Sequence, residues 1–85
     1  MTILFHKNFT KRLKKLSEKE QNLIKEKLEL FLLDQYHPRL RNHPLKGNYL
    51  GYRSIDIRPD MRAIFKDSDN VVIFVELGNH NQLFA

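Results

Sequence analysis

The sequence predicts an α+β fold in which a helical hairpin packs on one face of a mostly antiparallel four-stranded sheet. Residues 8–36 carry apolar side chains at helical spacing between many charges, whereas residues 49–77 alternate apolar and polar side chains or run apolar. Proline, glycine, aspartate and asparagine separate these segments. The predicted order is therefore β-α-α-β-β-β, in one domain over residues 1–85.

The first two predicted elements are short. Residues 2–6 form an apolar run that suits a strand. Asn8 can cap the helix that follows, in which Phe9, Leu13 and Leu16 recur at i, i+4 and i+7. Lysines and an arginine occupy the opposite side of that helix. We therefore expect a short, amphipathic and basic helix.

A capping box begins the second helix. The Ser17 hydroxyl can accept a hydrogen bond from the backbone N–H of Glu20, while the Glu20 carboxylate reaches back to Ser17. The apolar side of this helix consists of a central stripe and its flank: Ile24, Leu28, Phe31, Leu23, Leu30 and Leu32. The helix should end before Pro38, because the residue before proline disfavours the helical region. Two helices joined so tightly should lie antiparallel.

The second half of the chain predicts three consecutive strands, over residues 49–57, 61–66 and 71–77. A basic loop over residues 39–48 precedes them, and a short tail over residues 79–85 follows. Short connections favour an antiparallel meander, with residues 2–6 pairing elsewhere on the sheet. The helices then cover one face, and the other face, polar and basic, is a plausible platform for RNA.

The charge of the chain bears on its partners. It carries 15 lysine or arginine residues against 10 aspartate or glutamate residues, giving a formal net charge of +5 and a pI near 9.7. Nucleic acid, an acidic protein or an anionic membrane surface would be attracted to such a surface. A basic surface that only solvates the helices is the alternative.

Composition excludes several classes of site. The chain has no cysteine, which rules out a disulfide framework and a thiolate metal site and fits a reducing cytoplasm. Its four histidines show no tight ligand spacing, so we expect neither a metal nor a cofactor. No apolar stretch approaches the roughly 20 residues needed to cross a bilayer, and residues 1–6 are too short for a signal peptide's apolar core. We expect a cytoplasmic protein without a membrane role.

Four segments carry a resemblance to a known family: His43-Pro-Leu-Lys-Gly47, Gly51-Tyr-Arg53, Pro59-Asp60 and Gly78-Asn-His80-Asn-Gln-Leu-Phe84. In this order they resemble the RelE/ParE superfamily of bacterial toxins, and most closely its YafQ and RelE/StbE-like branch. The resemblance implies a microbial-RNase-like fold and the toxin of a type II toxin–antitoxin system. It also implies cleavage of mRNA in the ribosomal A site, contact with ribosomal RNA, and inhibition by an antitoxin whose neutralising segment should be acidic.

The chemistry that the resemblance implies is attack of the ribose 2′-OH on its neighbouring phosphate, without a metal. Such a reaction needs a group that accepts the 2′-OH proton, a cation for the charge of the transition state, and a proton donor for the leaving 5′-oxygen. Histidine suits both proton transfers because its unperturbed pKa of about 6.5 lies near neutrality. Arginine suits the phosphate through its charged, planar donor fork.

Four residues match catalytic positions of the family. His80 resembles the C-terminal histidine that acts as general acid, with a surface histidine in a tail as the alternative. Arg62 resembles the strand arginine that contacts the scissile phosphate; otherwise it would pair with Asp60 or Glu76. His43 lies where a base is plausible, or is simply a loop histidine before proline. Asp60 either orients a catalytic group or closes a turn.

Three further residues are expected to contact RNA. Arg53 and Lys46 can hold the phosphate backbone of mRNA or ribosomal RNA, which positions a substrate without reading its sequence. Phe84 matches a C-terminal aromatic residue that either stacks on a base or anchors the tail.

The chain departs from the YafQ pattern at three positions, with Asp56, Met61 and Glu76 in place of a histidine, a tryptophan and an arginine. Glu76 puts an anion near the presumed phosphate and, taken alone, argues against cleavage, whereas Arg62 offers a compensating cation. Two alternatives therefore stay open. One is a ParE-like inhibitor of DNA gyrase that is not a nuclease. The other is a weakened toxin that acts mainly in complex with its antitoxin.

Overall fold

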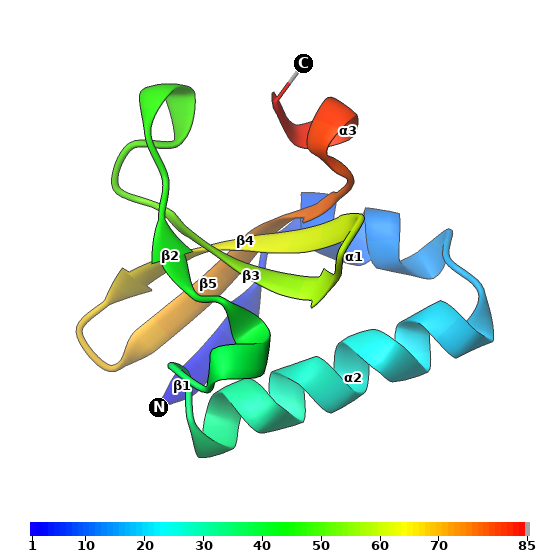
Figure 1. The fold of residues 1–85 in the computed structure, drawn as a ribbon, viewed down its shortest axis with the longest axis horizontal. Helices are drawn as coiled ribbons and strands as arrows, with labels where there is room; N and C mark the ends of the chain where they lie inside the picture. Colours follow the sequence, from blue (N-terminus) through cyan, green and yellow to red (C-terminus); the bar gives the residue numbers. More distant parts are fainter. Residues whose placement is uncertain (85) are drawn as a thin grey trace.

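A computed structural model describes residues 1–84 and has the predicted α+β architecture (Figure 1). The strands and helices, in chain order, are β1 (Thr2–Phe5), α1 (Lys7–Lys14), α2 (Glu18–Leu33), β2 (His43–Pro44), β3 (Arg53–Arg58), β4 (Met61–Ser68), β5 (Val71–Gly78) and α3 (His80–Phe84). Two 3₁₀ turns, η1 (Pro38–Leu40) and η2 (Gly47–Tyr49), flank β2. The tail predicted over residues 79–85 thus contains a short helix as far as Phe84.

The strands form one sheet in the order β1-β5-β4-β3-β2. The predicted meander is confirmed, because β3, β4 and β5 pair antiparallel in sequence order. The first strand pairs in parallel with β5, next to Val71–Phe74. The prediction of four strands is wrong by one, since His43 and Pro44 pair with Ser54 and Arg53 and add a two-residue edge strand. A strand of two residues, one of them proline, is too short to show an alternating pattern in the sequence, so it could not be predicted.

The ends of the helices show which local signals are reliable. The capping box at Ser17 is confirmed, with both of its reciprocal hydrogen bonds to Glu20 present. The predicted Asn8 cap is wrong, because the ring of His6 accepts the hydrogen bond from the Asn8 backbone N–H, so α1 begins at Lys7, two residues earlier than a cap at Asn8 predicts. Leu32 is also wrong as a core residue, since it is exposed at the end of α2. No helix among the described residues has the length and apolarity to cross a membrane.

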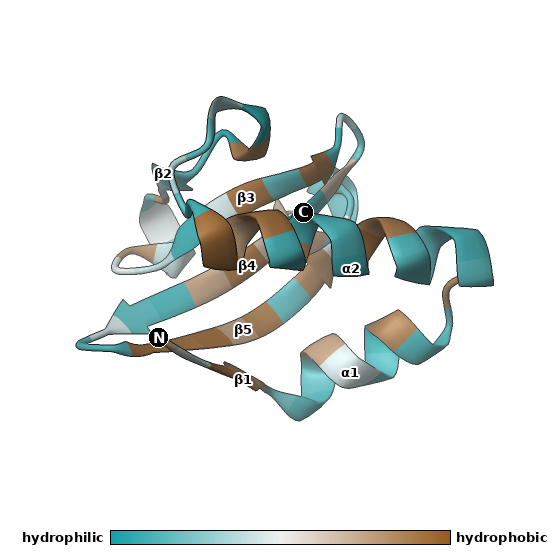
Figure 2. Ribbon diagram, turned by 90° about the horizontal axis from the view of Figure 1, so that it is seen from below, coloured by the Kyte–Doolittle hydropathy of each residue, from teal (hydrophilic) through white to brown (hydrophobic). Residues whose placement is uncertain are grey.

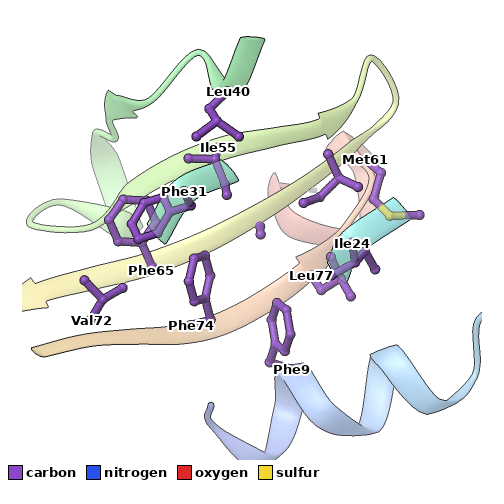
Figure 3. Packing of buried hydrophobic residues seen from close by; sticks show 12 residues of the cluster. Phe9, Ile24, Phe31, Leu40, Ile55, Met61, Phe65, Val72, Phe74 and Leu77 are labelled. Carbon is purple, nitrogen blue, oxygen red and sulfur yellow. The ribbon is translucent and has the colours of Figure 1, made fainter. Parts of the chain in front are cut away.

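Both long helices lie on the same side of the sheet and run in opposite directions (Figure 2). α1 packs mainly beside β5, and α2 packs beneath β3. The core between the layers is built around the ring of Phe74, which has no solvent exposure. Its neighbours are aromatic, with ring centroids 5.2 Å away in Phe65, 5.5 Å in Phe31 and 5.7 Å in Phe9 (Figure 3). We call this side of the sheet the helix face and the other side the polar face.

Two β-bulges decide which side chains reach the polar face. In β5, Ile64 pairs with Glu76 and Phe65 pairs with Phe74, so Val75 is an extra residue. Leu77 can therefore share the core with Phe74 although the two lie three positions apart. A second register shift, between Asp56 and Arg58, turns Arg58 toward α2.

The strand predicted over residues 49–57 begins four residues later. Gly47 and Gly51 have φ values of +64° and +92°, in the region that favours glycine, and they bend the chain around η2. Tyr49 and Tyr52 therefore belong to a loop that rises on the polar face, where α3 also lies (Figure 1).

Candidate active site

The polar face carries a mixture of charged and apolar side chains. Strand alternation and the bulges direct Asp56 from β3, Arg62 and Ile64 from β4, and Glu76 from β5 away from the core. The face is partly covered, because Ile64 is fully buried without belonging to the core cluster. The elements that cover it are the loop around η2 and helix α3, which meet where the rings of Tyr49 and Phe84 lie 5.6 Å apart.

One hollow of about 270 Å³ brings together three of the four predicted catalytic residues. Asp60 comes from the β3–β4 turn, Arg62 from β4, and His80 from the first position of α3. Residues 20 positions apart in the chain thus line one concave surface. His43 does not line this hollow; it lies on the edge strand β2 beyond β3.

Local hydrogen bonds fix the position of His80. The backbone N–H of Asn79 donates to Gln82 Oε1, and the backbone N–H of Gln82 donates to Asn79 Oδ1, both at 2.8 Å. This reciprocal pair caps α3. A side chain at Gly78 would crowd this cap, because a Cβ there would lie 2.7 Å from Gln82 Oε1. The His80 ring is exposed to solvent and packs on Phe84 at 5.0 Å between centroids.

Asp60 is held from the helix side. Its carboxylate accepts a 2.7 Å hydrogen bond from Arg58 Nε, and Arg58 Nη2 donates to Glu20 at 2.9 Å. The hydrogen bond to Asp60 raises the pKa of Arg58. Hydrogen bonds from the backbone N–H and hydroxyl of Ser17 lower the pKa of Glu20. The capping box of α2 is therefore connected, through Arg58, to the acidic residue of the hollow.

Arg62 pairs with neither Asp60 nor Glu76, the two partners expected if it were only a surface arginine; it pairs with Asp56. Its Nε lies 3.6 Å from Asp56 Oδ1, and the Nε of Arg41 lies 3.6 Å from the other oxygen of the same carboxylate. The Asp56 side chain is only 12% exposed, so both arginines converge on a largely buried anion. Sequence reasoning did not single out Arg41, which lies 15 positions from Asp56 in the predicted basic loop.

The ring of His43 is oriented by the backbone. Its Nδ1 lies 2.7 Å from the carbonyl oxygen of Arg41. A carbonyl oxygen can only accept, so Nδ1 carries the hydrogen, and in the neutral ring Nε2 is left with the lone pair. His43 is thus prepared to accept a proton at Nε2. The same Arg41 connects it to Asp56 and Arg62.

The three predicted RNA contacts fall in different places. Arg53 does not lie on the polar face, because it pairs in register with the core residue Phe65. Its guanidinium donates to Asn42 and lies 5.7 Å from the ring centre of Tyr36, at the rim of the helix face. Lys46 is exposed at the start of η2, as a backbone contact requires.

Phe84 packs between His80 and Tyr49, and this favours its anchoring role over base stacking. A hollow of about 260 Å³ on the polar face contains Tyr49, Tyr52 and Glu76. Burial raises the pKa of Tyr49, and the nearby Glu76 carboxylate raises it further. Gly51, between the two tyrosines, was the available signal for a loop here.

No group of three or more histidine, cysteine, aspartate or glutamate side chains within residues 1–84 could hold a metal ion.

Comparison with known proteins decides the family. The family model described as "Bacterial toxin of type II toxin-antitoxin system, YafQ" matches residues 1–85. The chain belongs to the YafQ toxin family. A curated relative, the mRNA interferase toxin YafQ of Escherichia coli K12, is 38% identical over 45 residues. That match spans 53% of this chain and only 49% of the relative, about half of each.

Solved structures extend the likeness to the whole fold. The crystal structure of YafQ from E. coli BL21(DE3) superposes with a TM-score of 0.84 at 25% identity, covering 98% of this chain and 97% of that one. The E. coli DinJ–YafQ toxin–antitoxin complex gives a TM-score of 0.78 at 27% identity, covering 98% and 96%. These values confirm the YafQ-like α+β architecture.

The structure accounts for two of the three departures from the YafQ pattern. Met61 is 6% exposed and belongs to the core cluster, so it serves as a packing residue. Glu76 accepts a 3.1 Å hydrogen bond from the side-chain amide of Asn8 in α1. It also shares a hollow with the α1 cations Lys11 and Arg12, which offset its charge. The remaining departure, Asp56, is the anion that both arginines approach.

Proposed function

We propose that this protein, as one toxin domain, is the toxin of a type II toxin–antitoxin pair and an endoribonuclease that cleaves ribosome-bound mRNA without a metal. One observation carries the proposal: Asp60, Arg62 and His80 line a single hollow on the polar face. The E. coli relative is named an mRNA interferase toxin, and the family model that matches the chain describes toxins of this system.

The proposed reaction uses three groups. His43 Nε2 takes the proton of the ribose 2′-OH as the oxygen attacks the neighbouring phosphorus. Arg62 donates hydrogen bonds to the phosphate oxygens, on which negative charge grows. His80, exposed at the mouth of the hollow, gives its proton to the 5′-oxygen as the P–O bond breaks. The products are a 2′,3′-cyclic phosphate and a free 5′-hydroxyl.

Asp60 has a positioning role in this proposal. Its carboxylate is engaged by Arg58, so it keeps the β3–β4 turn closed and the hollow in shape. Lys46 would contact the phosphate backbone of mRNA or ribosomal RNA, as would Arg53 from the rim of the helix face. The cognate antitoxin would place an acidic segment on the basic surface, in the cytoplasm. The E. coli relative has been crystallised with its antitoxin DinJ.

Primer extension on mRNA bound to translating ribosomes tests the proposal. Purified wild-type protein should cut within the A-site codon, and Arg62→Ala and His80→Ala should each lower cutting by about 100-fold or more. Arg39→Ala is the matched arginine control, since Arg39 is exposed on η1 away from the hollow. His6→Asn is the histidine control, because asparagine can replace the helix cap that His6 provides.

Each result has a definite meaning. Cuts that vanish only in Arg62→Ala and His80→Ala support the reaction and its residues. Cuts that persist in both variants refute the site assignment while keeping the nuclease. A folded, antitoxin-free protein that makes no cuts refutes the nuclease, and DNA damage after expression would then indicate a gyrase inhibitor.

A further inference from the structure

We propose that Arg41 and Arg62, gathered by Asp56, form one two-arginine site for a phosphate group, so that Arg41 is a further substrate-binding residue. The two guanidinium groups approach the two oxygens of one carboxylate, each through its Nε at 3.6 Å. The identity of the phosphate as part of an RNA strand rests on the proposed function. The existence of the anion site is independent of the proposed function.

The charges of the three groups leave the site cationic. One aspartate stands against two arginines, so a net positive charge faces the solvent beside the hollow that contains His80. Each guanidinium has four further N–H donors on its Nη atoms. No hydrogen bond within residues 1–84 engages those Nη donors of Arg41 or Arg62. Two free donor forks on a shared anchor match the oxygens of a phosphate.

Arg41 is placed by a backbone conformation that its residue type disfavours. It ends η1 with φ 50° and ψ 45°, in the left-handed region. Such a conformation persists only where the surroundings fix it, and strained residues of this kind cluster at active sites and ligand clamps. Here it directs the carbonyl oxygen to His43 and the guanidinium to Asp56. One residue therefore sets both the proposed base and the second cation.

Asp56 is a poor fit for a purely structural ion pair. Arg41 is 76% exposed, so its pair with Asp56 is screened by solvent and stabilises little. Asp56 Oδ1 and the neighbouring Ser54 Oγ are both buried, and neither forms a hydrogen bond within the described part of the chain. Buried polar atoms without hydrogen bonds destabilise the folded state, so their presence needs an explanation. Holding two arginines together at a binding site is such an explanation, which makes Asp56 a positioning residue.

An NMR titration with inorganic phosphate tests the pair directly. The Nε–H signals of Arg41 and Arg62 should shift along one shared saturation curve, while the Nε–H of Arg39 does not follow it. In Asp56→Asn, which keeps the side-chain shape, the two signals should no longer share a curve. Independent curves in the wild type, or a shared curve that survives Asp56→Asn, would overturn the proposal.

Binding of a non-cleavable 2′-O-methyl RNA oligonucleotide tests the role of Arg41. Asparagine tolerates the left-handed region, so Arg41→Asn removes the guanidinium while keeping the backbone. We expect affinity to fall on the order of tenfold and the salt dependence to lose about one phosphate contact. Arg39→Ala should change affinity less than about twofold, as expected for an exposed charge outside the site. Equal losses in the two variants would refute a specific pair.

The two proposals fail in different ways. Phosphate saturation on one curve without any mRNA cutting would refute the nuclease and support the anion pair. A-site cutting that Arg41→Asn and Arg39→Ala impair equally would refute the pair and support the nuclease.

Discussion

Replacement of Phe84 by alanine should loosen α3 while leaving the core intact. The Phe84 ring contacts two other rings, those of His80 at 5.0 Å and Tyr49 at 5.6 Å between centroids. An aromatic pair contributes about 0.5–1.5 kcal/mol beyond its buried area, so the loss of two pairs should destabilise α3 by about 1–3 kcal/mol. Since every 1.4 kcal/mol is a factor of ten, local opening should increase roughly 5- to 150-fold.

Native-state hydrogen exchange measures that opening. The reporters are the backbone amides of Leu83, bonded to the Asn79 carbonyl, and Gln82, bonded to the Asn79 side chain. Ala63 in the centre of β4 is the internal reference, because exchange there requires wider unfolding. Leu50→Ala, at a 77% exposed position in the same loop as Tyr49, is the matched control. Unchanged exchange at Leu83 together with weaker RNA binding would refute anchoring and favour stacking on a base.

Three further changes have defined outcomes. Ser17→Ala breaks the cap of α2 and should lower the melting temperature by roughly 4–8 °C. Ser17 lowers the pKa of Glu20, so this stabilisation is present above the ordinary pKa of a glutamate and is lost as pH falls through the lowered value. A stability difference between wild type and Ser17→Ala that stays constant in acid would contradict this. Tyr49 has a raised pKa, so its contribution is complete below the ordinary tyrosine value and is lost as pH rises through the raised one. Tyr49→Phe should therefore reduce the alkaline loss of stability in urea titrations, and an identical loss would refute the assignment. Gly51→Ala meets no atom within 4 Å but must adopt a φ of +92°, so denaturation should report a cost of about 1–2 kcal/mol, and a neutral effect would exclude that loop conformation.

The parts of the fold that the sequence predicted correctly depend on local patterns. The capping box at Ser17 needs only residues three positions apart, and the helix and strand periods need only one buried side. The loop around Gly51 was predicted as strand because Tyr49 and Tyr52 have high strand propensity. Positive φ at two glycines overrode that propensity, and the tyrosines joined the polar face as part of a loop.

The candidate site was predictable only in part, because its residues meet through long-range geometry. Family resemblance pointed to Asp60, Arg62 and His80, which do line one hollow, while their roles stay predictions. Arg53, which was expected to contact RNA, pairs in register with the core residue Phe65, and the face that a β3 residue takes depends on where the strand begins. Arg41 could not be found from the sequence, since its left-handed backbone and its approach to Asp56 have no local signature.

The bulge in β5 sets how the end of that strand meets the polar face. Val75 is the residue without a partner between Glu76 and Phe74, so its removal would leave those neighbours in regular alternation on their present faces. A deletion there, unlike one elsewhere in the strand, would spare the hydrophobic layer. It would remove the added local twist with which the strand delivers Gly78 and α3 to the polar face. The loss of one residue would thus keep the scaffold folded while it displaces His80 from Asp60 and Arg62.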